Sequence, residues 1–105
     1  MRRGEVWWAE LPQPMGRRPV LLLSRDEAYQ VREYIIVSPL TTRRRNLPTE
    51  VRLGPDDGLP QATVVNMDVI ITVPKRQIRE RITGLSPQEI RDVEAAVHFA
   101  LGIQD

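Results

Sequence analysis

The stretch Arg17-Arg18-Pro19-Val20-Leu21-Leu22-Leu23-Ser24 decides how this 105-residue chain is organised. Its apolar run is too short to span a membrane and is typical of a strand that is buried on both faces. Pro19 has no N–H for a sheet ladder, so we expect it at the first position of that strand, and it favours an extended conformation at Arg18. The pattern predicts that Arg18 is held at the rim of a sheet. Alternatively, Arg17 and Arg18 are solvated charges that protect an apolar strand from aggregation.

A second apolar run, Tyr34-Ile35-Ile36-Val37-Ser38-Pro39-Leu40, ends in Thr41-Thr42-Arg43-Arg44-Arg45. Because strands that follow each other in sequence are usually neighbours in space, we expect these hydroxyls and guanidiniums to gather with Arg18 at one end of the sheet. The other interpretation of Arg43, Arg44 and Arg45 is an ordinary solvated loop.

The length and composition favour a single domain, residues 1–105, with a core of modest size. The absence of cysteine excludes disulfides and thiolate metal sites, and it is consistent with a reducing compartment. The basic start, Met1-Arg2-Arg3, is followed by Glu5, Glu10 and Pro12 and not by the apolar segment of a secretory signal. We therefore expect a cytoplasmic protein.

The charge is unevenly distributed along the chain, although the net charge is only +1. Residues 1–49 carry nine arginines and five acidic residues, whereas residues 50–105 carry six cationic and nine acidic residues. Lys75 is the only lysine. Arginine suits bidentate contact with phosphate, so the first half is a candidate surface for a phosphate-rich partner. A GC-rich coding sequence would give the same preference for arginine over lysine.

The remaining pattern predicts short strands and one helix. Residues 4–11 form the expected first strand, on which Trp7 and Trp8 must face opposite ways. Further strands are expected at residues 50–53, 63–67, 69–73 and 81–85, with helical turns at residues 25–29 and 75–81. The segments 63–67 and 69–73 form either one long bent strand or two short strands separated near Asp68. Residues 54–60 have turn chemistry, and they lack the ligand spacing of a calcium loop, so no metal site is predicted.

The C-terminal helix has the clearest signals. Ser86-Pro87-Gln88-Glu89 is a capping box with proline at the first helical position, and Gly102 is a natural terminator. The expected apolar stripe, with Ala96 and Ala100 on its flank, consists of Ile90, Val93, Val97 and Leu101. Phe99 should point away from it, which suggests a partner surface. His98, the only histidine, has no partner motif, and we interpret it as structural. The whole pattern favours a mainly β fold, a small and strongly bent barrel with a C-terminal α-helix.

Several segments, in order along almost the whole chain, resemble the MazF/PemK (Kid) toxins of bacterial toxin–antitoxin modules. The matching segments are residues 3–11, 17–24, 37–42, 47–51, 58–66 and the start of the helix at Leu85-Ser86-Pro87. The resemblance implies an SH3-like small barrel of the CcdB/PemK type, a homodimer, and a toxin that a cognate antitoxin silences.

The resemblance also implies a metal-free endoribonuclease without a cofactor, which cuts mRNA or tRNA by attack of the ribose 2′-OH. It implies that Arg18 and Thr41 are catalytic. RNA contacts are expected from residues of the same region, namely Trp7, Arg17, Thr42, Arg43, Arg44 and Arg45. Arginine at such a site can place two N–H donors against the charge that develops on the phosphate.

The chain differs from the family's usual pattern in the loop between the first two strands. Residues 12–17 replace a longer glycine-rich loop, and the acid proposed as general base in some members is missing. Glu10 is a weak candidate for that base, and direct proton loss to water is another. A shortened loop predicts an open groove that admits folded RNA. Two other functions remain open, a CcdB-like toxin that binds DNA gyrase and an SH3-like adaptor.

Overall fold

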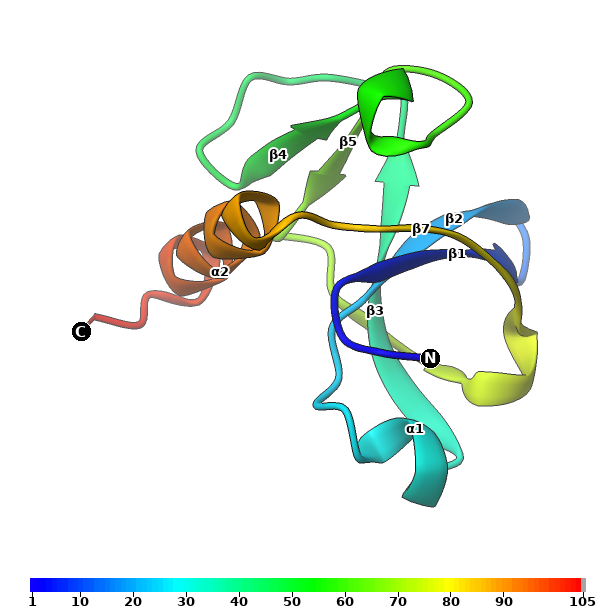
Figure 1. Ribbon diagram of the computed structural model, residues 1–105. Coiled ribbons are helices and arrows are strands. Elements are labelled where there is room, and N and C mark those ends of the chain that lie inside the picture. The colour runs from blue at the N-terminus through cyan, green and yellow to red at the C-terminus, as the bar shows by residue number, and fades with distance from the viewer. Residues whose placement is uncertain (105) are drawn as a thin grey trace.

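The structure is a computed structural model, and it describes residues 1–104. Its core is one curved antiparallel sheet in the order β4-β5-β3-β2-β1-β7, with β6 also paired to β3 (Figure 1). The strands are β1 (Glu5–Glu10), β2 (Arg17–Leu22), β3 (Tyr34–Thr41), β4 (Glu50–Leu53), β5 (Thr63–Asn66), β6 (Ile71–Pro74) and β7 (Ile78–Gly84). The short α1 (Ala28–Val31) and two 3-10 turns, η1 (Pro55–Asp57) and η2 (Lys75–Gln77), connect strands, and α2 (Pro87–Leu101) closes the chain. The mainly β class with a C-terminal helix is confirmed.

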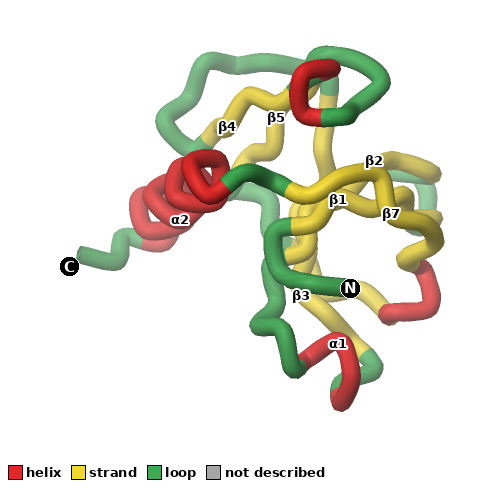
Figure 2. The backbone as a smooth tube through the Cα atoms, viewed as in Figure 1, coloured by secondary structure: helices red, strands yellow, loops and turns green. Residues whose placement is uncertain are grey.

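The longest strand, β3, joins the two halves of the sheet. On one edge it pairs with β2, from Val37 to Pro39, and on its other edge it pairs first with β6 and then, at Leu40 and Thr41, with β5. Figure 2 shows β3 running from the region of α1 to the region of β4 and β5. A strand that changes partners along its length bends the sheet, so β3 carries its polar C-terminal end to a rim between two groups of strands.

Apolar residues are buried on both faces of β2, as its sequence predicts. Leu21 belongs to a core cluster that also contains Met67 and Val93 and lies under α2. Val20 and Leu22 point into a second cluster on the other side of the sheet, with Ile35 and Val37. Because successive side chains of a strand alternate between faces, the continuous apolar run is what allows β2 to lie between two cores.

The helix α2 begins and ends as its sequence predicts. The Ser86 side chain accepts a hydrogen bond from the Glu89 N–H at 3.1 Å, and Glu89 Oε1 accepts one from the Ser86 N–H at 2.8 Å. Gly102 has the left-handed φ of 68° that terminates the helix. Val93 and Ala96 are buried, and Phe99 is 63% exposed, as expected. Leu101 is 60% exposed, so its predicted place in the buried stripe is wrong, because the helix extends past the strands that it covers.

The remaining differences from the sequence-based elements are small. Residues 63–73 form two strands separated around Asp68, one of the two predicted alternatives. The segment with turn chemistry contains the 3-10 turn η1, and the last strand begins at Ile78 instead of Arg81. Pro19 is the third residue of β2 and not the first, since its partner is Trp8 of β1 while the pairing of β2 with β3 starts only at Val20. Among residues 1–104, no helix is long and apolar enough to cross a membrane.

Candidate functional site

The candidate site lies where β2 and β3 separate. Their pairing covers only residues 20–22 of β2, and each step from Val20 toward the start of β2 corresponds to one step from Pro39 toward the end of β3. This register places Arg18 opposite Thr41, two residues beyond the last pair. Pro19 supplies no amide hydrogen for a continued ladder, and beyond Pro39 β3 keeps only its pairing with β5, on its other edge. The two polar side chains therefore face each other across a gap.

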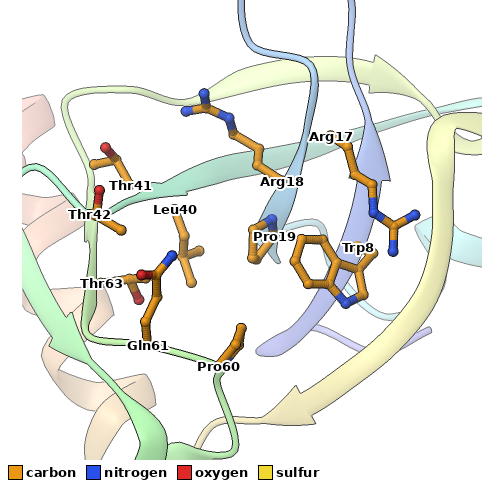
Figure 3. A pocket seen from close by; sticks show the side chains of 10 residues that line it. All are labelled: Trp8, Arg17, Arg18, Pro19, Leu40, Thr41, Thr42, Pro60, Gln61 and Thr63. Atoms are coloured by element: carbon orange, nitrogen blue, oxygen red, sulfur yellow. The ribbon is translucent and has the colours of Figure 1, made fainter.

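Two pockets open beside this gap, and both Arg18 and Thr41 line both of them. The central pocket, of about 270 Å³, is drawn in Figure 3 and is lined by Trp8, Arg17, Arg18, Pro19, Leu40, Thr41, Thr42, Pro60, Gln61 and Thr63. The loop pocket, of about 280 Å³, is lined by Met15, Arg18, Pro39, Thr41, Arg43, Arg45, Glu50, Asn66 and Val69. The convergence of Arg18 with Thr41, which the sequence predicts, is thus present in the structure.

Arg18 is held in place but keeps donors free. The side chain is half-buried, and its Nε–H donates to the Met15 carbonyl oxygen at 2.9 Å. Within residues 1–104 the two terminal nitrogens make no hydrogen bond or ion pair. A guanidinium fixed through Nε and open at both terminal nitrogens can present two parallel N–H groups to an anion.

Thr41 complements that arrangement. Its Oγ1 accepts a hydrogen bond from the Arg43 N–H at 3.2 Å, so one lone pair is occupied while the hydroxyl hydrogen remains free to donate. An arginine and a hydroxyl donor on opposite sides of a gap form a site for a tetrahedral oxyanion such as a phosphodiester.

Residues 42–47 after β3 are here called the basic segment, and residues 42–45 direct their side chains to different pockets. Thr42 lines the central pocket, while Arg43 and Arg45 line the loop pocket. Arg44 lines a third cavity of about 220 Å³, here called the flanking pocket, together with Thr42, Arg52, Leu53, Ala62 and Thr63. The side chains of Arg43, Arg44 and Arg45 form no ion pair within the described part of the chain. Their charges are therefore available to a ligand.

Glu50 holds the basic segment in position. Its carboxylate accepts hydrogen bonds from the backbone N–H groups of Arg45, at 3.0 and 3.2 Å, and Leu47, at 3.2 Å. It is the only acidic residue among those lining the three pockets, against six arginines. The surroundings of the site therefore favour an anion over a divalent cation.

Arg17 lies at the far edge of the central pocket. Its guanidinium carbon is 4.7 Å from the centroid of the Trp8 ring, a cation–π contact, and its Nη2 is 3.6 Å from a carboxylate oxygen of Glu80. In Figure 3 its head group lies beyond the Trp8 ring, away from Thr41. Part of its charge is thus already compensated, unlike that of Arg18.

The structure places Trp8, and not Trp7 as expected from the sequence, at the central pocket. Trp7 packs against the core cluster of Val20 and Leu22, and its Nε1–H donates to Glu5 at 3.1 Å. Trp8 faces the other side and lines the central pocket.

The hydrogen bond from Trp7 also affects the ionisation of Glu5. Burial alone raises the pKa of Glu5, but hydrogen bonds from Arg81 and Trp7 outweigh burial and hold that pKa below its ordinary value of 4.5. Trp7 is therefore part of a structural cluster.

Other residues of the site were not predicted from the sequence. They are Trp8, Glu50, Arg52, Gln61, Thr63 and Asn66, which reach the pockets from four segments: β1, β4, the loop before β5, and β5. Only Trp8 had a signal in the sequence, because two neighbouring tryptophans on a strand must face opposite ways. His98 lies on α2 and Glu10 pairs with Arg79 at 3.2 Å; neither is among the residues lining the three pockets.

Comparison with known proteins gives a consistent match. Residues 2–101 match the family model of the PemK-like, MazF-like toxin of type II toxin–antitoxin systems. A probable endoribonuclease MazF2 of Mycobacterium tuberculosis is 42% identical over 103 residues, which cover 97% of this chain and 99% of that protein. The solved Mycobacterium tuberculosis toxin MazF-mt6 superposes with a TM-score of 0.89 at 29% identity, covering 96% of this chain and 99% of that one. A mycobacterial endoribonuclease in complex with its cognate antitoxin gives a TM-score of 0.89 at 30% identity, covering all of this chain and 98% of the other.

Proposed function

This chain belongs to the PemK-like, MazF-like toxins of type II toxin–antitoxin systems, and we propose that it is an endoribonuclease whose activity arrests growth until a cognate antitoxin silences it. One observation carries the proposal, namely that Arg18 and Thr41, with free donors, line the same two pockets where β2 and β3 separate. Two relatives that match over nearly the whole chain are named probable endoribonuclease MazF2 and probable endoribonuclease MazF5.

The proposed reaction uses the ribose 2′-OH of RNA as the nucleophile. The 2′-oxygen forms a bond to phosphorus, the bond from phosphorus to the 5′-oxygen breaks, and the products are a 2′,3′-cyclic phosphate and a free 5′-OH. Arg18 places two N–H groups on the non-bridging oxygens and Thr41 donates a third hydrogen bond. Each such preorganised donor is worth roughly 3–4 kcal/mol of transition-state stabilisation.

Protons must leave the 2′-OH and reach the 5′-oxygen. Glu50 is the only carboxylate among the residues lining the pockets, and its two oxygens already accept three hydrogen bonds from the loop backbone. We therefore assign both proton transfers to water, with the protein supplying position and charge. The reaction needs no metal ion in this scheme, since arginine stays protonated at all relevant pH values.

The substrate class follows from the 2′-OH requirement and the cationic surroundings. The loop of residues 12–16 that precedes β2 is short, and of these residues only Met15 lines the pockets at Arg18. An uncovered groove of this kind would accept a folded RNA such as a tRNA arm as well as a single strand of mRNA. Cleavage of a linear RNA and of a tRNA carrying the same target sequence tests this; a strong preference for the linear RNA contradicts it.

We also propose two protein partners. A cognate antitoxin with acidic side chains would complement the unpaired arginines of residues 18 and 43–45, and a second copy of the chain would form a homodimer. Phe99, Leu101 and Ile103 are each at least half exposed at the end of α2, which provides apolar surface for a partner. We also propose that the protein acts in the cytoplasm, since this is where it would meet both the proposed RNA substrate and the proposed antitoxin.

The deciding experiment is incubation of the purified protein with cellular RNA in EDTA. We expect discrete cleavage products with cyclic phosphate ends, and loss of cleavage in Arg18→Ala. Arg32→Ala is the matched control, because Arg32 is exposed and lies before the opposite end of β3. Intact RNA accompanied by inhibition of DNA gyrase would refute the proposal in favour of a CcdB-like toxin.

A further inference from the structure

The basic segment after β3 presents its side chains alternately to two cavities. Thr41, Arg43 and Arg45 line the loop pocket. Thr42 and Arg44 line the flanking pocket on the other side. This alternation is the behaviour of an extended chain. Arg44 is therefore separated from its two arginine neighbours and belongs to a different surface.

The flanking pocket has the chemistry of an anion site. Arg44 contributes a guanidinium without any hydrogen bond or ion pair in the described chain, and Arg52 contributes a second from the outward face of β4. Two threonine side chains complete the polar lining, and no acidic residue is among those that line the pocket. Two cations that face one cavity repel each other, and an anion bound between them would offset that repulsion.

Arg52 is also oriented before any ligand arrives. Its Nη2 donates to the Asn46 side-chain oxygen at 2.9 Å. Asn46 has a φ of 56°, a left-handed conformation that asparagine tolerates better than most residues. One hydrogen bond fixes the guanidinium and leaves its other donors free.

The flanking pocket continues the central pocket. Thr42 and Thr63 line both cavities, just as Arg18 and Thr41 line both the central and the loop pocket. The three cavities thus form one row that follows the end of β3. A strand of RNA held at Arg18 and Thr41 that leaves along this row passes between Arg44 and Arg52.

We propose that the flanking pocket binds a backbone phosphate of the RNA next to the scissile one, with Arg44 and Arg52 as its two ligands. This inference rests on the proposed function, since it places the substrate relative to the reacting phosphate. Guanidinium contacts to phosphate carry no base information, so the pocket contributes affinity and register without adding sequence preference.

The test compares Arg44→Gln and Arg52→Gln with Arg32→Gln, all at exposed arginines. Arg44→Gln breaks no hydrogen bond of the described chain, so it separates loss of charge from loss of the contact to Asn46. For an RNA that extends past the cut on both sides, each of the two variants should raise KM about tenfold with kcat unchanged. Each should also lower the slope of log affinity against log salt concentration by about one. Arg32→Gln should change neither.

A series of progressively shorter RNAs locates the phosphate that binds in the flanking pocket. Once the RNA is too short to reach the flanking pocket, Arg44→Gln and the parent protein should cleave it with equal KM. Equal KM at every length, or a fall in kcat instead of a rise in KM, would overturn the inference.

Measuring RNA binding separately from RNA cleavage distinguishes a failure of the flanking site from a failure of the proposed function. Affinity for a fluorescein-labelled short single-stranded RNA is measured by anisotropy, alongside cleavage. If the parent protein cleaves no RNA but Arg44→Gln and Arg52→Gln still weaken binding, the endoribonuclease proposal fails while the anion site stands. If the parent cleaves and the two variants behave like Arg32→Gln, the flanking site fails alone.

Discussion

Arg18 lies opposite Thr41 in the register of β2 and β3, although the two strands no longer pair at that point. Residues opposite each other on one face of an antiparallel pair are in contact distance. The lost pairing converts this contact into a gap with a cation on one side and a hydroxyl on the other. The ligand site is thus the position at which a sheet would otherwise have continued.

Thr41→Val should reduce kcat by about 100-fold, because it removes one preorganised donor and keeps the shape of the side chain. Thr41→Ser retains the hydroxyl and should stay within about tenfold of the parent. Initial rates on a fluorophore–quencher RNA measure both. A Thr41→Val protein as active as the serine variant would show that the hydroxyl has no part in the reaction.

Glu50→Ala should raise KM about tenfold with a smaller effect on kcat, because three hydrogen bonds to the backbone of the basic segment are lost. Hydrogen exchange at the amides of Arg45 and Leu47 should accelerate in the same variant. Glu50→Gln keeps one acceptor oxygen and should restore part of the protection. Unchanged exchange in Glu50→Ala would contradict a positioning role.

Trp8 should report RNA binding through its fluorescence, whereas Trp7 should not. The two residues are the only tryptophans, so Trp7→Phe and Trp8→Phe each leave a single emitter. We expect the Trp7→Phe protein to change its emission on titration with an RNA that carries the 2′-deoxy sugar at the cut. A binding-dependent signal that survives in Trp8→Phe would place the ligand on the opposite face of β1.

Asp57→Asn should stabilise the protein near neutral pH. Burial, followed by the hydrogen bond and charge of the Asp57 carboxyl, raises the pKa of Glu89 above its ordinary 4.5. A raised pKa means that the folded state binds the proton more tightly, so stability is complete below the unfolded-state pKa and falls as pH rises through the folded-state pKa. The variant removes the part of that loss that the Asp57 carboxyl causes, while the part due to burial remains.

We expect Asp57→Asn to raise Tm by about 2 °C at pH 7 and to leave it unchanged below pH ~4. Asparagine keeps an oxygen for the Gly54 N–H, which Asp57 binds at 2.8 Å. Asp56→Asn changes the neighbouring acid of the same turn and serves as the control. A gain in Tm that is equal at both pH values would exclude the ionisation of Glu89 as its cause.

Ser86→Ala should cost about 1 kcal/mol of stability, because the N-cap hydrogen bond to Glu89 is lost. Thermal unfolding should show this as a fall in Tm of roughly 4–8 °C. Cleavage rates measured well below Tm should match those of the parent, since none of the residues lining the three pockets belongs to α2. Loss of activity at those temperatures would connect the helix to the site.

The parts of the site that were predictable are those with local signals. The arginine–proline pair before β2 and the threonines that end β3 could be found because each marks the end of an apolar run. Arg52 could not be found in this way, since it reaches the flanking pocket only when the β4–β5 hairpin folds back toward Thr42. Glu50 looks like an ordinary polar strand residue until the loop that it binds is closed.

The sequence by itself determined the elements whose causes lie within a few residues. The capping box and Gly102 set the ends of α2, and the apolar run of β2 required a core on each face. Only the tertiary structure decided the register that brings residue 18 opposite residue 41, the side of β1 that became the pocket wall, and the exposure of Leu101. These depend on which strands pair and where pairing stops, and that is settled by the packing of the whole sheet against its two cores, because no short segment carries enough free energy to fix it alone.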